Sequence, residues 1–249
     1  LPMTIPTYIA AYAYYDILEL LNPIFNWFRI NIGIKETMMI ESFLIYLIVI
    51  ILFSFVLYPY VYLSVRASLL ISGNRLIESA ITLGLPSNKI FKKLILPSTK
   101  PAIIAGLSLV IMETLNDYAA VEYFGISTLT IGIFRAWFGM YDMASALKLS
   151  SYLILFVFSI LITEKIIRGK ERYNNINGSQ ITFSKIPVKN KKIFLVFILC
   201  FTPFIFGFFI PFVRLLTWLL YSSFNFEDMN IVQISFNTIF ISLIASLSI

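Results

Sequence analysis

Long apolar stretches separated by short polar segments dominate the pattern of this 249-residue chain. A helix that crosses the hydrocarbon core of a bilayer needs about 20 mostly apolar residues. Runs near that length occur six times, so the pattern predicts six membrane-spanning helices, and prolines inside three of the runs are tolerated if the helices pack in a bundle. The runs lie near Met3–Leu21, Ser42–Val65, Pro101–Tyr118, Leu147–Ile167, Ile193–Leu220 and from Ile234 to the end of the chain.

A different pattern lies between the second and third runs. We expect a short helix over about 75–83, a left-handed stop at Gly84, and a second helix that Ser87 caps and Pro97 ends. One face of the second helix is apolar and the rest is basic. The apolar residues are Ile90, Phe91, Leu94 and Ile95, and the basic residues are Lys89, Lys92 and Lys93. This helical hairpin therefore predicts a protein-docking surface at the membrane face.

Composition agrees with this all-α, polytopic membrane protein. Hydrophobic residues make up 59% of the chain and charged residues 13%, with a mean hydropathy of +0.88. So little polar surface cannot cover a soluble globule.

The distribution of the 19 basic residues predicts the orientation, because cytoplasmic loops are enriched in Lys and Arg. Six lie in the segment Arg66–Lys100 and eight in the segment Lys165–Lys192, so both segments are expected in the cytoplasm. The connections near 22–41, 113–142 and 221–230 then lie outside. Positive-inside bias and anionic lipid account for the pI of about 9.3, and no nucleic-acid partner is expected.

The residue types for catalysis are scarce. The chain has no histidine and one cysteine, Cys200, which excludes a zinc site and a Cys-His nucleophile. No phosphate-binding loop of the G-x-x-x-x-G-K-[ST] type is present. We therefore expect no enzyme and no cofactor bound by this chain, so the energy for any transport must come from a partner.

The hairpin region resembles a known motif, the EAA loop of ABC importer permeases. Ser79 stands where the motif has its second alanine, and Leu94 where it has isoleucine. The matching positions are Glu78, Ser79, Ala80, Gly84, Leu94, Leu96 and Pro97. The resemblance implies a type I permease fold in a bacterial inner membrane, and it implies that these residues dock a cytoplasmic ABC ATPase dimer that hydrolyses ATP. It also implies a periplasmic substrate-binding protein as a partner. The alternative is a generic amphipathic hairpin.

Two later stretches, Glu113–Gly125 and Thr130–Phe138, resemble the permeases of ferric-iron importers. The resemblance implies iron as the substrate. Importers of thiamine, polyamines and oxyanions share the architecture and parts of these motifs, so they remain alternatives. An ion-coupled secondary transporter is the alternative from another class.

Several polar residues of these stretches are candidates for the substrate pathway. Glu113 and Asp117 are four residues apart and share a helix face, and carboxylate oxygens suit a hard cation. The other interpretation is that both face water or pair with Arg135. Glu122 and Tyr123 are expected at the outer gate or at the surface that receives a binding protein. The residues that would ligate a metal are left unassigned.

The domain organisation follows from a polar segment near the middle of the chain. Residues 1–168, with the EAA loop at 74–97, are expected to be the later part of a first permease repeat. Residues 169–192 would be a cytoplasmic linker, and residues 193–249 the start of a second repeat. Because the chain starts at Leu1 and ends inside an apolar run, we expect it to be part of a longer protein.

Overall fold

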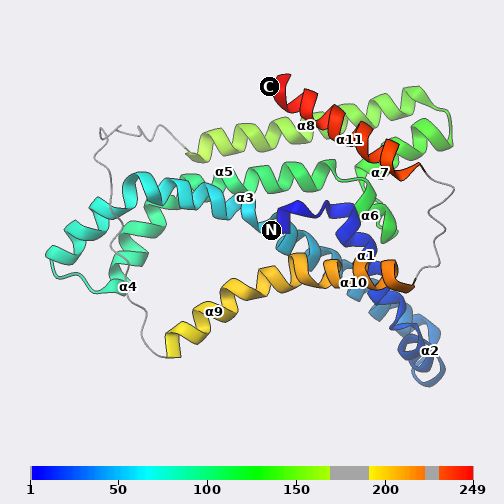
Figure 1. Ribbon diagram of the computed structural model, residues 1–249, viewed down its shortest axis with the longest axis horizontal. Coiled ribbons are helices and arrows are strands. Elements are labelled where there is room, and N and C mark those ends of the chain that lie inside the picture. The colour runs from blue at the N-terminus through cyan, green and yellow to red at the C-terminus, as the bar shows by residue number, and fades with distance from the viewer. Residues whose placement is uncertain (1, 169–190, 222–229, 249) are drawn as a thin grey trace. The chain divides into compact units, whose positions relative to one another are not determined.

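The computed structural model describes residues 2–168, 191–221 and 230–248, and within these ranges it is helical without strands (Figure 1). The predicted all-α class is confirmed. The elements are η1 (Pro2–Thr4), α1 (Thr7–Glu19), α2 (Asn22–Asn31), α3 (Ile34–Thr82), α4 (Ser87–Ile90), η2 (Phe91–Ile95), α5 (Leu96–Asn116), α6 (Ala119–Tyr123), α7 (Leu129–Phe134), η3 (Arg135–Gly139), α8 (Met143–Arg168), α9 (Lys191–Phe204), η4 (Ile205–Phe209), α10 (Ile210–Tyr221) and α11 (Ile231–Ser248).

Four helical stretches in the described part are long and apolar enough to cross a membrane. They are Ile34–Leu70, Asn88–Asn116, Met143–Ile167 and Ile193–Tyr221, and they correspond to four of the six expected spans. The last expected span is a shorter apolar helix, Val232–Ser248.

The first expected span differs most from the prediction. Pro6 stands at the N-cap of α1 with an extended backbone, which separates α1 from η1. The remaining helix has 13 residues, and at 1.5 Å per residue it is about 20 Å long. That length falls short of the roughly 30 Å of a hydrocarbon core, so α1 does not span it alone.

Small residues let the first helices pack closely. Ala10 and Ala11 of α1 are fully buried in the same apolar cluster as Leu52 of α3. α3 also packs on α5, where a Cβ built on Gly106 would lie 2.6 Å from the Cα of Val61. Only glycine permits this backbone approach.

A π-helical turn, η4, lies in the middle of the candidate span Ile193–Tyr221. The Ile210 amide donates to the carbonyl of Ile205, which is a bond five residues back. In the same pattern the Phe206 carbonyl would accept from the amide of residue 211. This residue is Pro211, which has no N–H to donate. The Phe206 carbonyl is instead bonded by the hydroxyl of Tyr14, which donates to it over 2.6 Å. A side chain of α1 thus satisfies a carbonyl that the helix releases.

The same turn also contacts α3. The rings of Phe55 and Phe206 stack with centroids 5.2 Å apart, and a Cβ on Gly207 would collide with the Phe55 carbonyl. The span that follows the expected linker therefore packs on helices of the expected first repeat.

By internal contacts the chain divides into two units, Leu1–Phe212 and Val213–Ile249. The linker predicted at 169–192 lies outside the described residues except for Lys191 and Lys192, which begin α9. The division into two permease repeats stays a prediction.

Candidate functional site

The hairpin at the end of α3 is closed by backbone hydrogen bonds around Gly84. Its φ of +70° is in the left-handed region, as the sequence predicts. The Leu85 amide donates to the Ala80 carbonyl at 3.0 Å, and the Gly84 amide donates to the Ile81 carbonyl at 2.9 Å. This pair of bonds is the Schellman motif, which satisfies the last carbonyls of a helix.

The two helices of the hairpin differ from the prediction in their extent. The helix expected over 75–83 is the last part of α3, which continues without a break to Thr82. Pro97 does not end the second helix, because the chain continues from α4 through the π-helical η2 into α5. Pro97 directly follows this π-helical turn, in which the Leu96 amide donates to the Phe91 carbonyl. The hydroxyls of Ser98 and Thr99 both donate to the Ile95 carbonyl.

The surface of the hairpin is apolar and basic. Ala80 and Ile90 are buried, whereas Ile81, Leu83 and Phe91 are at least half exposed. Of the other predicted docking residues, Ser79, Leu96 and Pro97 are exposed and Leu94 is half-buried, while the Glu78 side chain is outside the described part. Exposed Lys89, Lys92 and Lys93 accompany them. Such a surface suits a groove with apolar walls and acidic edges.

At the other end of α5, Asp117 is held by two hydrogen bonds. Its Oδ1 accepts from the Ala120 amide at 2.8 Å, and its Oδ2 accepts from the hydroxyl of Thr7 at the start of α1. Among the described residues, neither Asp117 nor Glu113 forms an ion pair with Arg135. Asp117 therefore fixes the turn into α6 and joins it to α1.

Glu113 lies close to this contact. It is exposed and lines a cavity of about 170 Å³ together with Thr7, Pro6 and Tyr60. Since Thr7 also contacts Asp117, the structure brings both predicted carboxylates to the start of α1.

Glu122 and Arg135 meet at a different residue, Tyr118. A hydrogen bond with Glu122 is the main cause that raises the pKa of the Tyr118 hydroxyl above its usual value, and nearby Arg135 partly offsets it. The Tyr118 ring also stacks on Phe134, with centroids 4.1 Å apart. The predicted pathway residues thus form two groups. Glu113 and Asp117 lie beside α1, whereas Glu122 and Arg135 lie near Tyr118, whose ring stacks on Phe134 of α7.

Tyr123 packs on α1. Its ring lies against Tyr12 of α1, with centroids 5.4 Å apart, and its side chain is exposed. Both Glu122 and Tyr123 are thus accessible on α6, as an outer surface requires.

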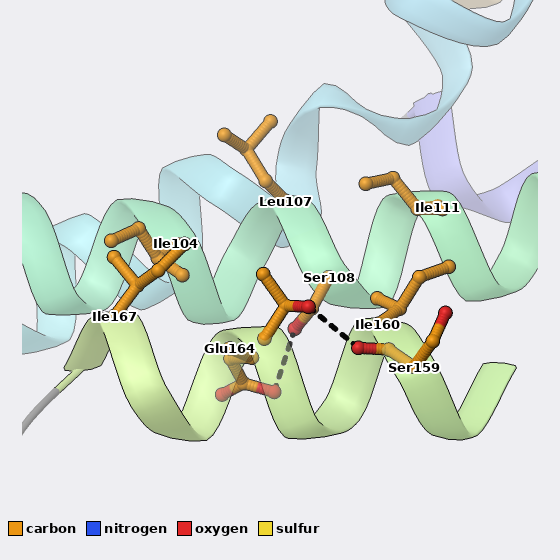
Figure 2. A pocket seen from close by; sticks show the side chains of 9 residues that line it. Ile104, Leu107, Ser108, Ile111, Ser159, Ile160, Glu164 and Ile167 are labelled. Carbon is orange, nitrogen blue, oxygen red and sulfur yellow. Dashed lines mark hydrogen bonds between the residues drawn. The ribbon is translucent and has the colours of Figure 1, made fainter. Parts of the chain in front are cut away.

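One polar group escaped the sequence analysis. Glu164 of α8 lies inside the third candidate span, and the Ser108 hydroxyl of α5 donates to its Oε2 at 3.1 Å (Figure 2). The two residues are 56 positions apart, so only the packing of α5 beside α8 reveals the contact (Figure 1). The local signal was a carboxylate within an apolar run, which by itself marks a candidate site.

Among the described residues, no group of three or more His, Cys, Asp or Glu side chains is placed to hold a metal ion. Any cation in this part of the protein would meet one or two carboxylates at a time.

Comparison with known proteins agrees with these features. The family model described as "Binding-protein-dependent transport system inner membrane component" matches residues 1–169. The Fe(3+)-transport system permease protein FbpB 2 of Haemophilus influenzae is 27% identical over 164 residues, which cover 66% of this chain and 32% of that protein. The chain thus spans about a third of the length of this relative. No solved structure matches. The chain belongs to the family of inner membrane components of binding-protein-dependent transport systems.

Proposed function

We propose that this chain is part of the permease subunit of an ABC importer that moves ferric iron across a bacterial inner membrane. A separate cytoplasmic ATPase dimer supplies the energy, and a periplasmic binding protein delivers the substrate. The hairpin closed at Gly84 is the observation that supports this most directly, because it exposes apolar and basic residues at the end of two candidate spans.

Force from a docked ATPase has a continuous path through the helices. The hairpin is formed by the end of α3 and by α4 and η2, which lead without a loop into α5. A rigid connection of this kind lets a displacement of the hairpin move the spans themselves. This supports an importer driven by ATP rather than an ion-coupled secondary transporter.

Iron as the substrate is supported by the oxygen-rich outer end of α5 and by the similarity to the Fe(3+)-transport permease of Haemophilus influenzae. Hard cations prefer carboxylate and hydroxyl oxygens. A site with few ligands also releases its ion readily, which transport requires. The same architecture would serve an importer of thiamine, a polyamine or an oxyanion.

The docking part is tested with the full-length permease. Co-expression with the ATPase from the same transport system should yield a complex that purifies in one peak and hydrolyses ATP. A permease that binds no ATPase would refute the docking proposal.

The substrate part is tested by uptake of radiolabelled iron into vesicles. Asp117→Asn keeps both hydrogen bonds within reach, since the amide oxygen accepts from Ala120 and the amide nitrogen faces Thr7, yet it removes the charge. Combined with Glu113→Gln, it should lower iron uptake without loss of protein. Glu19→Gln, an exposed carboxylate at the end of α1, is the control. Uptake of thiamine but not of iron by the unmodified complex would refute the substrate.

A further inference from the structure

The uncharged part of α3 indicates where its charged residues lie in a membrane. Between Glu41 and Arg66, the segment Ser42–Val65 carries no charged residue. As part of one helix it is roughly 36 Å long at 1.5 Å per residue. That length slightly exceeds the roughly 30 Å of a hydrocarbon core, so Glu41 and Arg66 are expected at the two lipid–water interfaces. Arg66 lies toward the hairpin, and Glu41 therefore lies at the opposite interface.

An ion pair holds α2 at the level of Glu41. The Nη2 of Arg29 in α2 lies 2.8 Å from the Oε2 of Glu41. Phe25 of α2 is buried in the same apolar cluster as Val49 and Leu52 of α3. α2 is thus attached to α3 by an ionic and an apolar contact, at the end of α3 opposite the hairpin (Figure 1). This attachment places α2 at the level of the lipid head groups.

A second apolar face of α2 is exposed. Ile24, Trp27 and Ile30 recur every three residues, and their side chains are 51%, 59% and 84% exposed. Trp27 and the buried Phe25 point roughly 160° apart, because successive residues of a helix turn by about 100°. α2 therefore has one apolar face toward α3 and another apolar face away from it.

The polar residues of α2 lie on one edge between these two faces. Asn22, Asn26 and Arg29 fall within about 60° of one another around the helix axis. A helix at a membrane surface has this arrangement, with its polar side toward water and its apolar side among the acyl chains. Tryptophan is also enriched at this depth. Exposed apolar patches mark contacts with proteins or membranes, and the level of Glu41 favours the membrane.

We propose that α2 is an interfacial helix whose Ile24, Trp27 and Ile30 side chains insert among the upper acyl chains of the leaflet opposite the hairpin. Because Arg29 is paired with Glu41, the contact requires no anionic lipid. The leaflet is the outer one if the proposed importer function holds, whereas the lipid contact itself does not depend on transport. The connection before α3 is then partly embedded in lipid, and it is not a loop in water.

The test measures quenching of Trp27 fluorescence in the full-length permease, reconstituted in phosphatidylcholine nanodiscs. The emission of Trp27 is the difference between the unmodified protein and Trp27→Phe. Bromine on the acyl chains near the glycerol should remove most of this emission. Bromine near the chain ends should quench it less, because an interfacial helix reaches only about 5–10 Å into the boundary between head groups and acyl chains. Acrylamide in the water should quench it weakly.

The matched control is Asn26→Trp in the Trp27→Phe background, which moves the indole by one residue to the polar edge. This tryptophan should be quenched more by acrylamide and less by brominated lipid than Trp27 is. Ile30→Cys, labelled with a nitroxide as the single cysteine of the protein, gives a second measurement. Oxygen, which concentrates in the bilayer, should reach this label better than a water-soluble nickel chelate does.

Access to both positions from water alone would overturn the proposal and indicate a surface that is free for a protein partner. Protection from both kinds of quencher would also overturn it and indicate that another part of the full-length chain covers α2. The measurements need neither the ATPase nor iron. Lipid contact in a protein that imports no iron would therefore leave this inference standing while the substrate proposal fails, and iron import without lipid contact would refute only this inference.

Discussion

At the scale of single residues, glycines at similar surface positions are under different constraints. Gly84 and Gly139 both have open space where a Cβ would lie, yet only Gly84 has a positive φ, of +70°. A side chain at Gly84 would therefore meet no neighbouring atom, but it would strain the left-handed backbone conformation.

Gly84→Ala should destabilise the hairpin by about 1 kcal/mol through strain in the left-handed conformation. Thermal unfolding of the full-length permease and its yield of co-purified ATPase would measure the effect. Gly139→Ala is the matched control and should change neither. Equal behaviour of the two variants would contradict the assigned role of Gly84.

The pKa of the Tyr118 hydroxyl should lie above that of an ordinary tyrosine, because the Glu122 carboxylate favours the neutral hydroxyl. Glu122→Gln should lower the Tyr118 pKa, and Arg135→Gln should raise it further, since Arg135 favours the phenolate. Ultraviolet difference spectra, with Tyr118→Phe subtracted, would follow the titration. A raised folded-state pKa stabilises the fold below the ordinary tyrosine pKa, and that contribution disappears as the pH rises through the folded-state value. Shifts of the same sign in both variants would contradict the arrangement.

At the scale of elements, the sequence predicts that prolines inside the spans are tolerated and that Pro97 ends a helix, whereas in the structure the helix continues past Pro97 as well. Pro59 lies inside α3, Pro97 lies near the start of α5, and Pro211 follows a π-helical turn. The apolar runs after the first are predicted well from the sequence, because length and hydrophobicity are local properties, whereas the break at Pro6 leaves α1 too short to span. The Tyr14–Phe206 and Ser108–Glu164 contacts are not, because they join residues 192 and 56 positions apart.

Tyr14→Phe should destabilise the bundle by about 1–3 kcal/mol, because the Phe206 carbonyl loses its donor in an apolar setting. Chemical denaturation of the full-length protein in detergent would measure this. In a Pro211→Ala background the new amide can serve the carbonyl, so the same change should have a smaller effect. Tyr8→Phe, which is about half exposed, is the control. Equal effects in both backgrounds would show that the released carbonyl is not what Tyr14 satisfies.

At the scale of the whole molecule, the charge pattern and the helix boundaries lead to the same topology. The hairpin that follows α3 carries Lys89, Lys92 and Lys93, while the connection before α8 carries exposed Met140 and Tyr141. α5 and the segment from α6 to η3 connect these two places, and α5 belongs to a candidate span. The hairpin and this connection are therefore expected on opposite sides of the membrane.

Cysteine labelling would test this topology. With Cys200 replaced by serine, no other cysteine remains in this chain, so single reporters can be introduced. Lys92→Cys should react with a membrane-impermeant maleimide only in inside-out vesicles, because the hairpin faces the cytoplasm. Tyr141→Cys, at a side chain that is 89% exposed, should react only in right-side-out vesicles. Each reporter serves as the control for the other, since permeabilised vesicles should label both. Labelling of both reporters from one side would place the two ends of α5 on the same side of the membrane, which would refute its assignment as a span. The reverse labelling pattern would invert the orientation, so that a cytoplasmic ATPase could not reach the hairpin.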